Sequence, residues 1–436
     1  MMRIREHKIL TLLFDTAMFF FGIFSLPHFW MKSKQAADRK KFFCERLGRL
    51  EYARPSGKRL IWIHAVSVGE VAAVKKFVEG IRANFPGTEV LVSTVTPTGQ
   101  AMAESFRPFG CKLIYFPFDI SFIVRHVLCR INPDLILLAE TEIWPNFILQ
   151  AKALGIPAGI INGRISAKSL SGYRKAAFLI RPVFESLEFL LVQTEEDKER
   201  YCQLGVDSSK VHVLGNMKFD QTEISEEDSS IKIKLGYDKE DQVLIAGSTH
   251  SGEEKLVFEA VKVLRREFPN LKVLIAPRHP ERAVEVAEEA RKTGFQPKFY
   301  SSADGTISDN QALIIDQIGV LKKIYPASDL VVMGGSFIPH GGQNPIEPSA
   351  CARPVLSGPY ISNFHAVYDV FVSAGSALII TEGQLVQKTR EILSDDLKRK
   401  EMGHQGLQVV LKQRGATERH LNWIKNLITQ EDLMHA

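Results

Sequence analysis

The sequence is poor in cysteine, and its cysteines do not pair by spacing. There are five in 436 residues, and no two form a C-x-x-C arrangement. This pattern excludes a disulfide framework and a cysteine zinc site, and it indicates reduced thiols in a cytosolic compartment. The five are Cys44, Cys111, Cys129, Cys202 and Cys351.

Three motifs that mark common enzyme classes are also missing. The chain has no G-x-x-x-x-G-K-[ST] phosphate loop, no G-x-G-x-x-G after its first apolar strand and no H-E-x-x-H. Their absence argues against a P-loop NTPase, a dinucleotide-dependent dehydrogenase and a zincin. No clustered pair of aspartates suggests a metal carrier, so we expect no metal site.

Composition and charge indicate a two-domain globular protein with one basic end. Hydrophobic residues make up 45% of the chain and charged residues 24%, and 436 residues are too many for one ordinary core. Residues 1–60 hold 13 Lys/Arg against 5 Asp/Glu, a net charge of +8, whereas the whole chain carries +5. A nucleic-acid binder spreads basic residues over a domain face, so this concentration favours an anionic membrane surface as partner, and no nucleic acid.

An apolar stretch lies inside this basic end, between Lys8 and Lys32. It is long enough to cross a bilayer, which takes about 20 apolar residues. The heavier basic cluster downstream favours the body of the protein on the cytoplasmic side. A helix lying flat in the cytoplasmic leaflet explains both basic flanks equally well. We expect residues 1–32 to be a single N-terminal membrane anchor; the alternative is a buried helix of a soluble core.

From residue 60 onward, short apolar runs alternate with amphipathic stretches, which predicts parallel sheets covered on both faces. The polar, acidic segment 216–241 interrupts this rhythm and is expected to be a linker. The fold class is therefore α/β, with two Rossmann-like, doubly wound domains at 33–215 and 242–436, whose last helix could pack back on the first domain. The expected strands are LIWIHAV, EVLVSTV, KLIYF, DLILLAE, PAGIIN and FLLVQ, then VLIAGS, KVLIAP, ALIID, LVVMGG, PVLSG and ALIIT.

Ligands of doubly wound sheets bind beyond the carboxyl ends of the strands, so the residues there are the candidates. Glu70 falls in the first turn of the helix after the first strand, where the helix dipole favours an ionised carboxylate. Such a group could serve as a general base, or it could merely complement the dipole. Glu140 and Glu142 alternate along an extended segment, so we expect one of them to face the crevice. Arg164 follows the next strand and suits a phosphate or carboxylate.

The second half has three anion-binding candidates. Ser248 and Thr249 place two hydroxyls near a helix start, and Arg278 and His279 stand at the carboxyl end of a strand. The densest feature is MGGSFIPHGGQNPIEPSA, a glycine-rich loop leading into a helix whose free N–H groups could hold a phosphate. One turn into that helix, Glu347 has two oxygens for the hydroxyls of a ribose. Together these residues predict a nucleotide-phosphate site.

The ordered motifs of the whole chain resemble those of the bacterial 3-deoxy-D-manno-octulosonic acid (Kdo) transferases, glycosyltransferases of the GT-B fold with a central cleft. The resemblance runs from the apolar anchor almost to the C-terminus, and it rests on many motifs in order. They are ERLG (45–48), IHAVSVGE (63–70), TPTG (96–99), ETEIWPN (140–146), NGRIS (162–166), GNMKFD (215–220), GSTHSGEE (247–254), PRHPER (277–282) and GGSFIPHGGQNPIEPSA (334–350).

This resemblance implies CMP-Kdo as donor and a lipid A precursor as acceptor, at the cytoplasmic face of the inner membrane. It implies an inverting displacement with neither metal nor cofactor, and it matches Glu70 to the family's general base. The positions that it matches to the donor site are Arg278, Asn344 and Glu347, and Gly341 and Gly342 lie in the loop just before Asn344. It matches Lys218 and Ser248 to positions near the donor phosphate or the Kdo carboxylate. The sequence identifies no protein partner.

Two other readings use the same architecture. A nucleotide-sugar 2-epimerase would have two such domains but no need of a basic, apolar N-terminus. A membrane-anchored nucleotide sensor would keep the 334–350 loop but have no use for Glu70.

Overall fold

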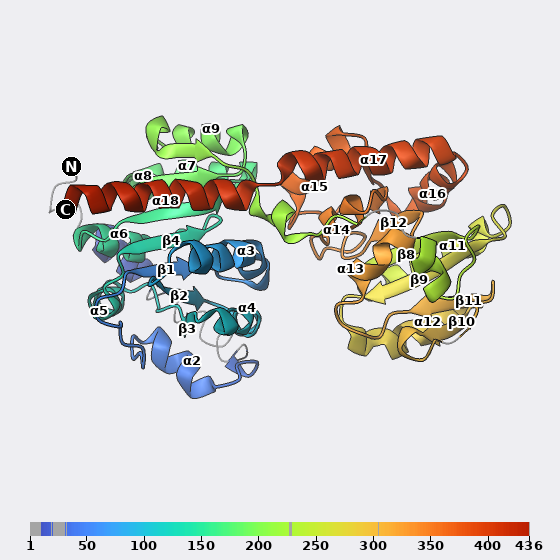
Figure 1. Ribbon diagram of the computed structural model, residues 1–436, viewed down its shortest axis with the longest axis horizontal. Helices are drawn as coiled ribbons and strands as arrows, with labels where there is room; N and C mark the ends of the chain where they lie inside the picture. The colour runs from blue at the N-terminus through green and yellow to red at the C-terminus, as the bar shows by residue number, and fades with distance from the viewer. Residues whose placement is uncertain are drawn as a thin grey trace. The chain divides into compact units, whose positions relative to one another are not determined.

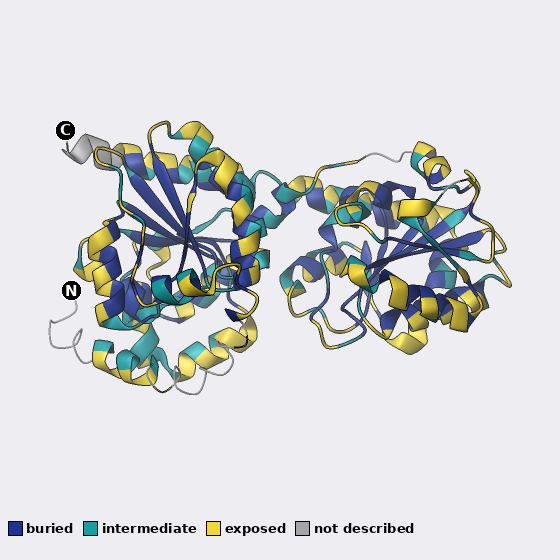
Figure 2. Ribbon diagram, turned by 90° about the horizontal axis from the view of Figure 1, so that it is seen from below, coloured by how far each residue is buried: buried dark blue, intermediate teal, exposed yellow. Residues whose placement is uncertain are grey.

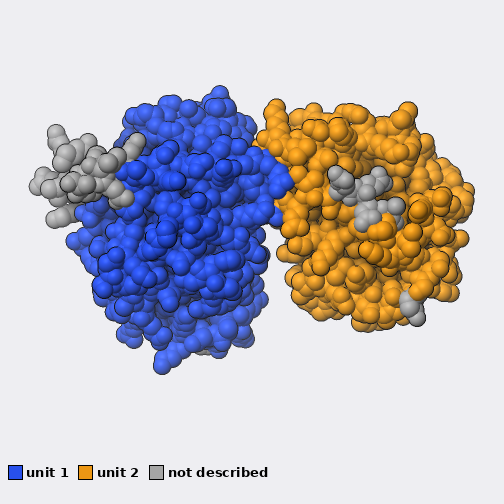
Figure 3. All heavy atoms as spheres, viewed as in Figure 1, with its two compact units in different colours: residues 1–221, 414–436 blue, residues 222–413 orange. Residues whose placement is uncertain are grey.

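The computed structural model describes residues 10–18, 20, 31, 33–225, 229–303 and 305–435. The chain forms two compact units, coloured separately in Figure 3. Unit 1 comprises Met1–Gln221 and Arg414–Ala436, and unit 2 comprises Thr222–Gln413. The segment 216–241 is thus not a separate linker but is divided between the two units. The C-terminal helix belongs to unit 1.

Unit 1 is built on a parallel sheet (Figure 1) that, within the described residues, has seven strands in the order β3-β2-β1-β4-β5-β6-β7. The order reverses between β1 and β4, where two crossovers leave in opposite directions; ligands of such sheets bind beyond the carboxyl ends at this point. Six of the strands are the expected ones, and β7 is an addition. Their bounds are β1 Leu60–His64, β2 Glu89–Thr94, β3 Lys112–Tyr115, β4 Leu135–Ala139, β5 Ala158–Gly163, β6 Phe189–Val192 and β7 Val211–Val213.

Helices cover both faces of this sheet, because successive side chains of each strand point to opposite sides. Trp62 packs with Phe147 of α6 on one face, and Ile61 packs with residues of α3 and α18 on the other. Every residue of β1 is buried, as Figure 2 shows for the central strands. The helices are α2 Arg39–Arg46, α3 Val68–Asn84, α4 Pro97–Ala103, α5 Ser121–Ile131, α6 Pro145–Ala153, α7 Ala167–Lys175, α8 Ala177–Glu185, α9 Glu195–Gln203 and α18 Ala416–His435.

Unit 2 repeats the design. Its described residues form a parallel sheet of seven strands in the order β10-β11-β9-β8-β12-β13-β14, with the reversal between β8 and β12. The strand β10 adds to the six expected. The strands are β8 Gln242–Thr249, β9 Leu271–Pro277, β10 Gln296–Phe299, β11 Gln311–Ile314, β12 Leu330–Met333, β13 Val355–Ser357 and β14 Ala377–Ile379. The helices are α10 Ser229–Lys234, α11 Glu253–Leu264, α12 Ala283–Thr293, α13 Leu321–Ile324, α14 Ile346–Ala350, α15 His365–Ser373, α16 Leu385–Leu393 and α17 Asp396–Gln413.

The return of the chain to unit 1 is fixed by Asp220. This buried carboxylate in the 3₁₀ helix η3 (Met217–Gln221) accepts hydrogen bonds from the backbone N–H groups of Gly415, at 2.7 Å, and Thr417, at 2.6 Å. It therefore caps α18, whose first N–H groups have no partner within the helix. Ile424 and Ile428 of α18 then join the core between the helix and the sheet.

Most of the expected anchor, residues 1–32, lies outside the described residues. Residues 10–18 are helical, and Asp15 accepts hydrogen bonds from the N–H of Ser121, at 2.8 Å, and from Nδ2 of Asn146, at 3.0 Å. Leu10 joins the core of unit 1, whereas Leu12 is 67% exposed. Of the helices in the described part of the chain, none has the length and apolar character to cross a bilayer.

Candidate functional site

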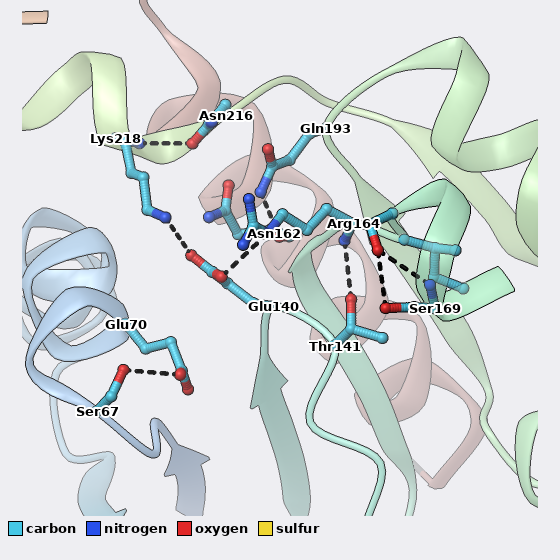
Figure 4. Close-up of polar contacts among 12 residues, drawn as sticks. Ser67, Glu70, Glu140, Thr141, Asn162, Arg164, Ser169, Gln193, Asn216 and Lys218 are labelled. Atoms are coloured by element: carbon cyan, nitrogen blue, oxygen red, sulfur yellow. Dashed lines mark hydrogen bonds and ion pairs between the residues drawn. The ribbon is translucent and has the colours of Figure 1, made fainter. Parts of the chain in front are cut away.

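In unit 1, polar side chains collect where the strand order reverses. Glu70 lies in the first turn of α3, directly after β1, and its Oε2 accepts from the N–H of Val66 at 2.7 Å. Its Oε1 accepts from the hydroxyl of Ser67 at 2.9 Å (Figure 4). The carboxylate therefore fixes the backbone just before its own helix, a structural role at the helix start. It also lies beyond the carboxyl end of β1, where a general base is expected.

The protonation state of Glu70 differs from the expectation. Burial first, and then the charges of Glu142 and Glu140, raise the pKa of Glu70 to about 8. The expectation that it stays ionised at neutral pH was wrong, because burial and two nearby carboxylates outweigh the helix dipole and two hydrogen bonds. Burial and the charge of Glu140 also raise the pKa of Glu142, to about 7.

Glu140 is the ionised member of the group. Burial alone would raise its pKa, but Lys218 and Arg164 together hold the pKa below its ordinary value. The Lys218 ammonium lies 2.6 Å from Oε1 of Glu140 and the Arg164 Nε lies 3.5 Å from Oε2, as Figure 4 shows. The backbone at Glu140 has φ of +55°, so it is not extended. The reasoning that placed Glu140 and Glu142 on opposite sides therefore fails, and both carboxylates act on Glu70.

The structure places Lys218 in unit 1, on η3. The resemblance matched it to a position near the donor phosphate or the Kdo carboxylate. In the structure its ammonium pairs with Glu140, a carboxylate of the Glu70 group. Asn162 holds the start of η3 next to β5, since its Oδ1 accepts from the N–H of Met217 at 2.9 Å. The ion pair of Lys218 with Glu140 gives both charges a partner, because an unpaired ion in a protein interior is costly.

In unit 2, two loops meet at the reversal between β8 and β12. Gly334 has no room for a side chain, because a Cβ there would lie 2.3 Å from the carbonyl oxygen of Ser248. Ser248 itself has φ of +56°. The hydroxyl of Thr249 donates to Oε1 of Glu254 at 2.8 Å, and α11 begins only at Glu253. The expected cradle of two hydroxyls at a helix start is therefore not formed: the Thr249 hydroxyl is already used.

The glycine-rich loop has the predicted close turns but fewer free N–H groups. Gly341 and Gly342 have φ of +91° and +76°. The side chain of Asn344 caps α14, its Oδ1 accepting from the N–H of Ile346 at 3.1 Å. The expectation that this helix offers its free N–H groups to a phosphate therefore holds only in part.

Glu347 lies within electrostatic reach of Arg278, the residue grouped with it in the sequence analysis. Burial raises the pKa of Glu347, and the charges of Lys322 and Arg278 oppose that rise, so both cations act on this carboxylate. Lys322 lies on the four-residue helix α13, and no motif in the sequence pointed to it.

Three histidines lie beside these residues. The rings of His250 and His340 stack with centroids 4.1 Å apart, and His279 lies 6.1 Å from His250. Burial, then His340, His279, Arg282 and Arg278, lower the pKa of His250 to about 4. In the part of the chain that the structure describes, no group of three or more His, Cys, Asp or Glu side chains could hold a metal ion. The cations and imidazole rings of this cluster suit an anion.

Two parallel sheets, each of seven strands in the described residues and each with polar residues at its point of reversal, define a GT-B-like α/β fold. A family model described as 3-deoxy-D-manno-octulosonic-acid transferase (kdotransferase) matches residues 41–221. The 3-deoxy-D-manno-octulosonic acid transferase of Haemophilus influenzae is 31% identical over 90% of this chain and 91% of its own length. That of Chlamydophila psittaci is 31% identical over 98% and 99%. The chain belongs to the 3-deoxy-D-manno-octulosonic acid transferase family.

Among solved structures, the UDP-GlcNAc 2-epimerase of Neisseria meningitidis, bound to UDP-GlcNAc, aligns with a TM-score of 0.58 at 14% identity. It covers 85% of this chain and 100% of its own. At that identity the likeness shows the fold alone. It also explains why architecture by itself leaves an epimerase as an alternative.

The raised pKa of Glu70 predicts that this carboxyl costs stability at alkaline pH. A carboxyl whose pKa is higher in the folded than in the unfolded chain weakens folding as pH rises from about 4.5 toward 8. We expect Glu70→Gln to stabilise unit 1 by roughly 1–3 kcal/mol at pH 8, and the gain to vanish near pH 4.5. Thermal unfolding across this range measures it, with Glu79→Gln on the same helix as control. A gain that does not depend on pH would contradict the raised pKa.

Proposed function

We propose that the protein transfers Kdo from CMP-Kdo to a lipid A precursor in lipopolysaccharide biosynthesis. Family membership over nine-tenths of the chain carries this proposal, since the relatives are named as transferases of that acid. The donor would carry two anions, the phosphate of CMP and the carboxylate of Kdo. Unit 2 offers cations for both at its point of reversal, where Arg278 and Lys322 act on Glu347 beside the three histidines.

For this reaction the protein must position the two substrates, supply one base and stabilise the charge on the departing CMP. The activated sugar already carries CMP as its leaving group, so no general acid is strictly needed on that side. A hydroxyl of the acceptor attacks the anomeric carbon of Kdo, its proton passes to a base, and the bond to the CMP phosphate breaks with inversion. The cations of unit 2 would stabilise the negative charge that remains on the departing CMP.

Glu70 is the base that we assign to this step. Its pKa of about 8 lies close to neutral pH, which suits a group that must take a proton in the transition state yet be partly ionised beforehand. Glu142 and Glu140 contribute to that pKa through their charges, and Lys218 with Arg164 keeps Glu140 ionised. The cations therefore act on the base indirectly, through the carboxylate that they hold.

Mass spectrometry of the products formed from CMP-Kdo and a lipid A precursor tests the function directly. We expect the acceptor to gain the mass of one or more Kdo residues, and Glu70→Gln to slow transfer by a factor of about 10² or more, because a general base is removed. A 2-epimerase would leave the acceptor mass unchanged and isomerise its donor. A nucleotide sensor would bind CMP and form no product. Unchanged turnover in Glu70→Gln would remove that residue from the mechanism.

The influence of Glu142 on the base gives a pH prediction. A base of raised pKa is protonated, and so inactive, at low pH, and kcat/KM rises as pH passes through the pKa. Removing the charge of Glu142 should lower the pKa of Glu70, so Glu142→Gln should move the acidic limb of the profile to lower pH. Because the two carboxyls interact, the limb reports the pair. A limb that stays in place would show that Glu142 does not tune the base.

For the membrane, we propose attachment at the cytoplasmic face of the inner membrane through the N-terminal segment. The +8 net charge of residues 1–60 and the apolar stretch between Lys8 and Lys32 support it.

Deleting residues 1–31 should move the protein from the membrane fraction to the supernatant. If the truncated protein still binds anionic vesicles, the basic residues 32–59 are the stronger attachment. If the intact protein binds neither vesicles nor membranes, the proposal fails.

A further inference from the structure

Glu253 has the densest set of backbone contacts at the unit 2 reversal, and no role assigned above uses it. It is the first residue of α11 and only 1% exposed. Its Oε2 accepts from the N–H of Gly335 at 2.7 Å and from that of His250 at 2.9 Å. Its Oε1 accepts from the N–H groups of Ser336 at 3.0 Å and Phe337 at 2.9 Å. One carboxylate thus binds four backbone donors from two loops.

The three consecutive N–H groups of residues 335–337 point to one place, which is the arrangement of an anion-binding nest. In this protein the nest is occupied by the side chain of Glu253. These three N–H groups are therefore not available to a donor phosphate, although the sequence of a glycine-rich loop after a strand suggests a phosphate site. Its effect is to join the loop that follows β12 to the loop that follows β8.

The positions of His250, His340 and Gln343, near the candidate donor-binding residue Asn344, depend on this junction between the two loops. The N–H of Gly342 donates to the carbonyl of Gly335 at 2.7 Å, which links the fixed end of the loop to the turn before Asn344. The ring of His250 stacks on that of His340, and Nε2 of Gln343 lies 3.3 Å from Nε2 of His250. Glu253 therefore sets the spacing between the loop that carries His250 and the loop that carries His340 and Gln343.

We propose that Glu253 is a positioning residue for the nucleotide-sugar donor: it holds the glycine-rich loop and the His250 turn in their binding arrangement without contacting the donor. This inference rests on the proposed function of unit 2 as the donor unit. It predicts that a change at Glu253 weakens donor binding specifically, whereas the acceptor, whose candidate residues lie in unit 1, binds as before.

Glu253→Gln tests this at constant side-chain length. One oxygen becomes an NH₂ group, which faces two N–H donors and leaves them without an acceptor. We expect CMP to bind about tenfold more weakly by calorimetry, and the KM for CMP-Kdo to rise by a similar factor while the KM for the acceptor stays constant. A merely structural defect would lower kcat through a smaller folded fraction and leave the donor KM unchanged.

Asp329→Asn is the matched control. Asp329 is a buried carboxylate of the same unit at the opposite end of the sheet, where its Oδ2 accepts from the N–H of Val243 at 2.9 Å and from Nζ of Lys232 at 2.8 Å. We expect this variant to unfold at a lower temperature with an unchanged donor KM. If Glu253→Gln does not fold, Glu253→Asp, which keeps both oxygens on a shorter stem, should fold and show the raised donor KM.

The outcomes separate the two proposals. If the wild-type protein does not bind CMP, the proposed donor site is wrong. If the wild type binds CMP and the folded Glu253 variant binds it equally well, the donor site stands and the positioning role is refuted. A donor KM raised as much by Asp329→Asn as by Glu253→Gln would also refute it, because general loosening of unit 2 would then explain the effect.

Discussion

Burial of both faces of two parallel sheets is the constraint on which the rest of this structure depends. Strands such as β1 and β9 are buried along their whole length, so they cannot carry exposed polar chemistry. Polar groups must then gather where strands end, and the reversal of strand order leaves space there in each unit. Glu70 and Glu140 in unit 1, and Glu253 and Gly335 in unit 2, occupy equivalent places in the two sheets. The site chemistry thus follows from where apolar packing ends.

The two reversals use charge in opposite ways. In unit 1 burial, followed by the charges of neighbouring carboxylates, raises the pKa of Glu70 and Glu142. In unit 2 Arg278 and Lys322 act on Glu347, and burial, followed by neighbouring imidazoles and arginines, lowers the pKa of His250. An acceptor hydroxyl needs a base and a donor needs cations, so each group of residues matches one of the two substrates that we propose.

Much of the fold could be predicted because it rests on local patterns. Twelve apolar runs gave twelve of the fourteen strands in the described residues, and the two missed, β7 and β10, are short edge strands with little apolar signal. Strand order could not be predicted, since it depends on contacts between distant segments. The protonation of Glu70 was missed for the same reason: its burial, and the nearby charges of Glu140 and Glu142, arise only when segments about seventy residues apart come together. Thr249 was misjudged because its hydroxyl donates to Glu254, a contact that the sequence does not reveal.

The capping of α18 by Asp220 has a consequence for how the protein is made. Unit 1 includes α18, which follows unit 2 in the sequence, so during synthesis the whole of unit 2 emerges before α18 does. Until then the face of the sheet that packs against Ile424 and Ile428 is uncovered, while unit 2 already has its full sequence. Unit 2 can therefore fold first during translation, and unit 1 is completed only after α18 has been synthesised. A chain truncated before residue 416 would leave the candidate base in a unit without one of its covering helices.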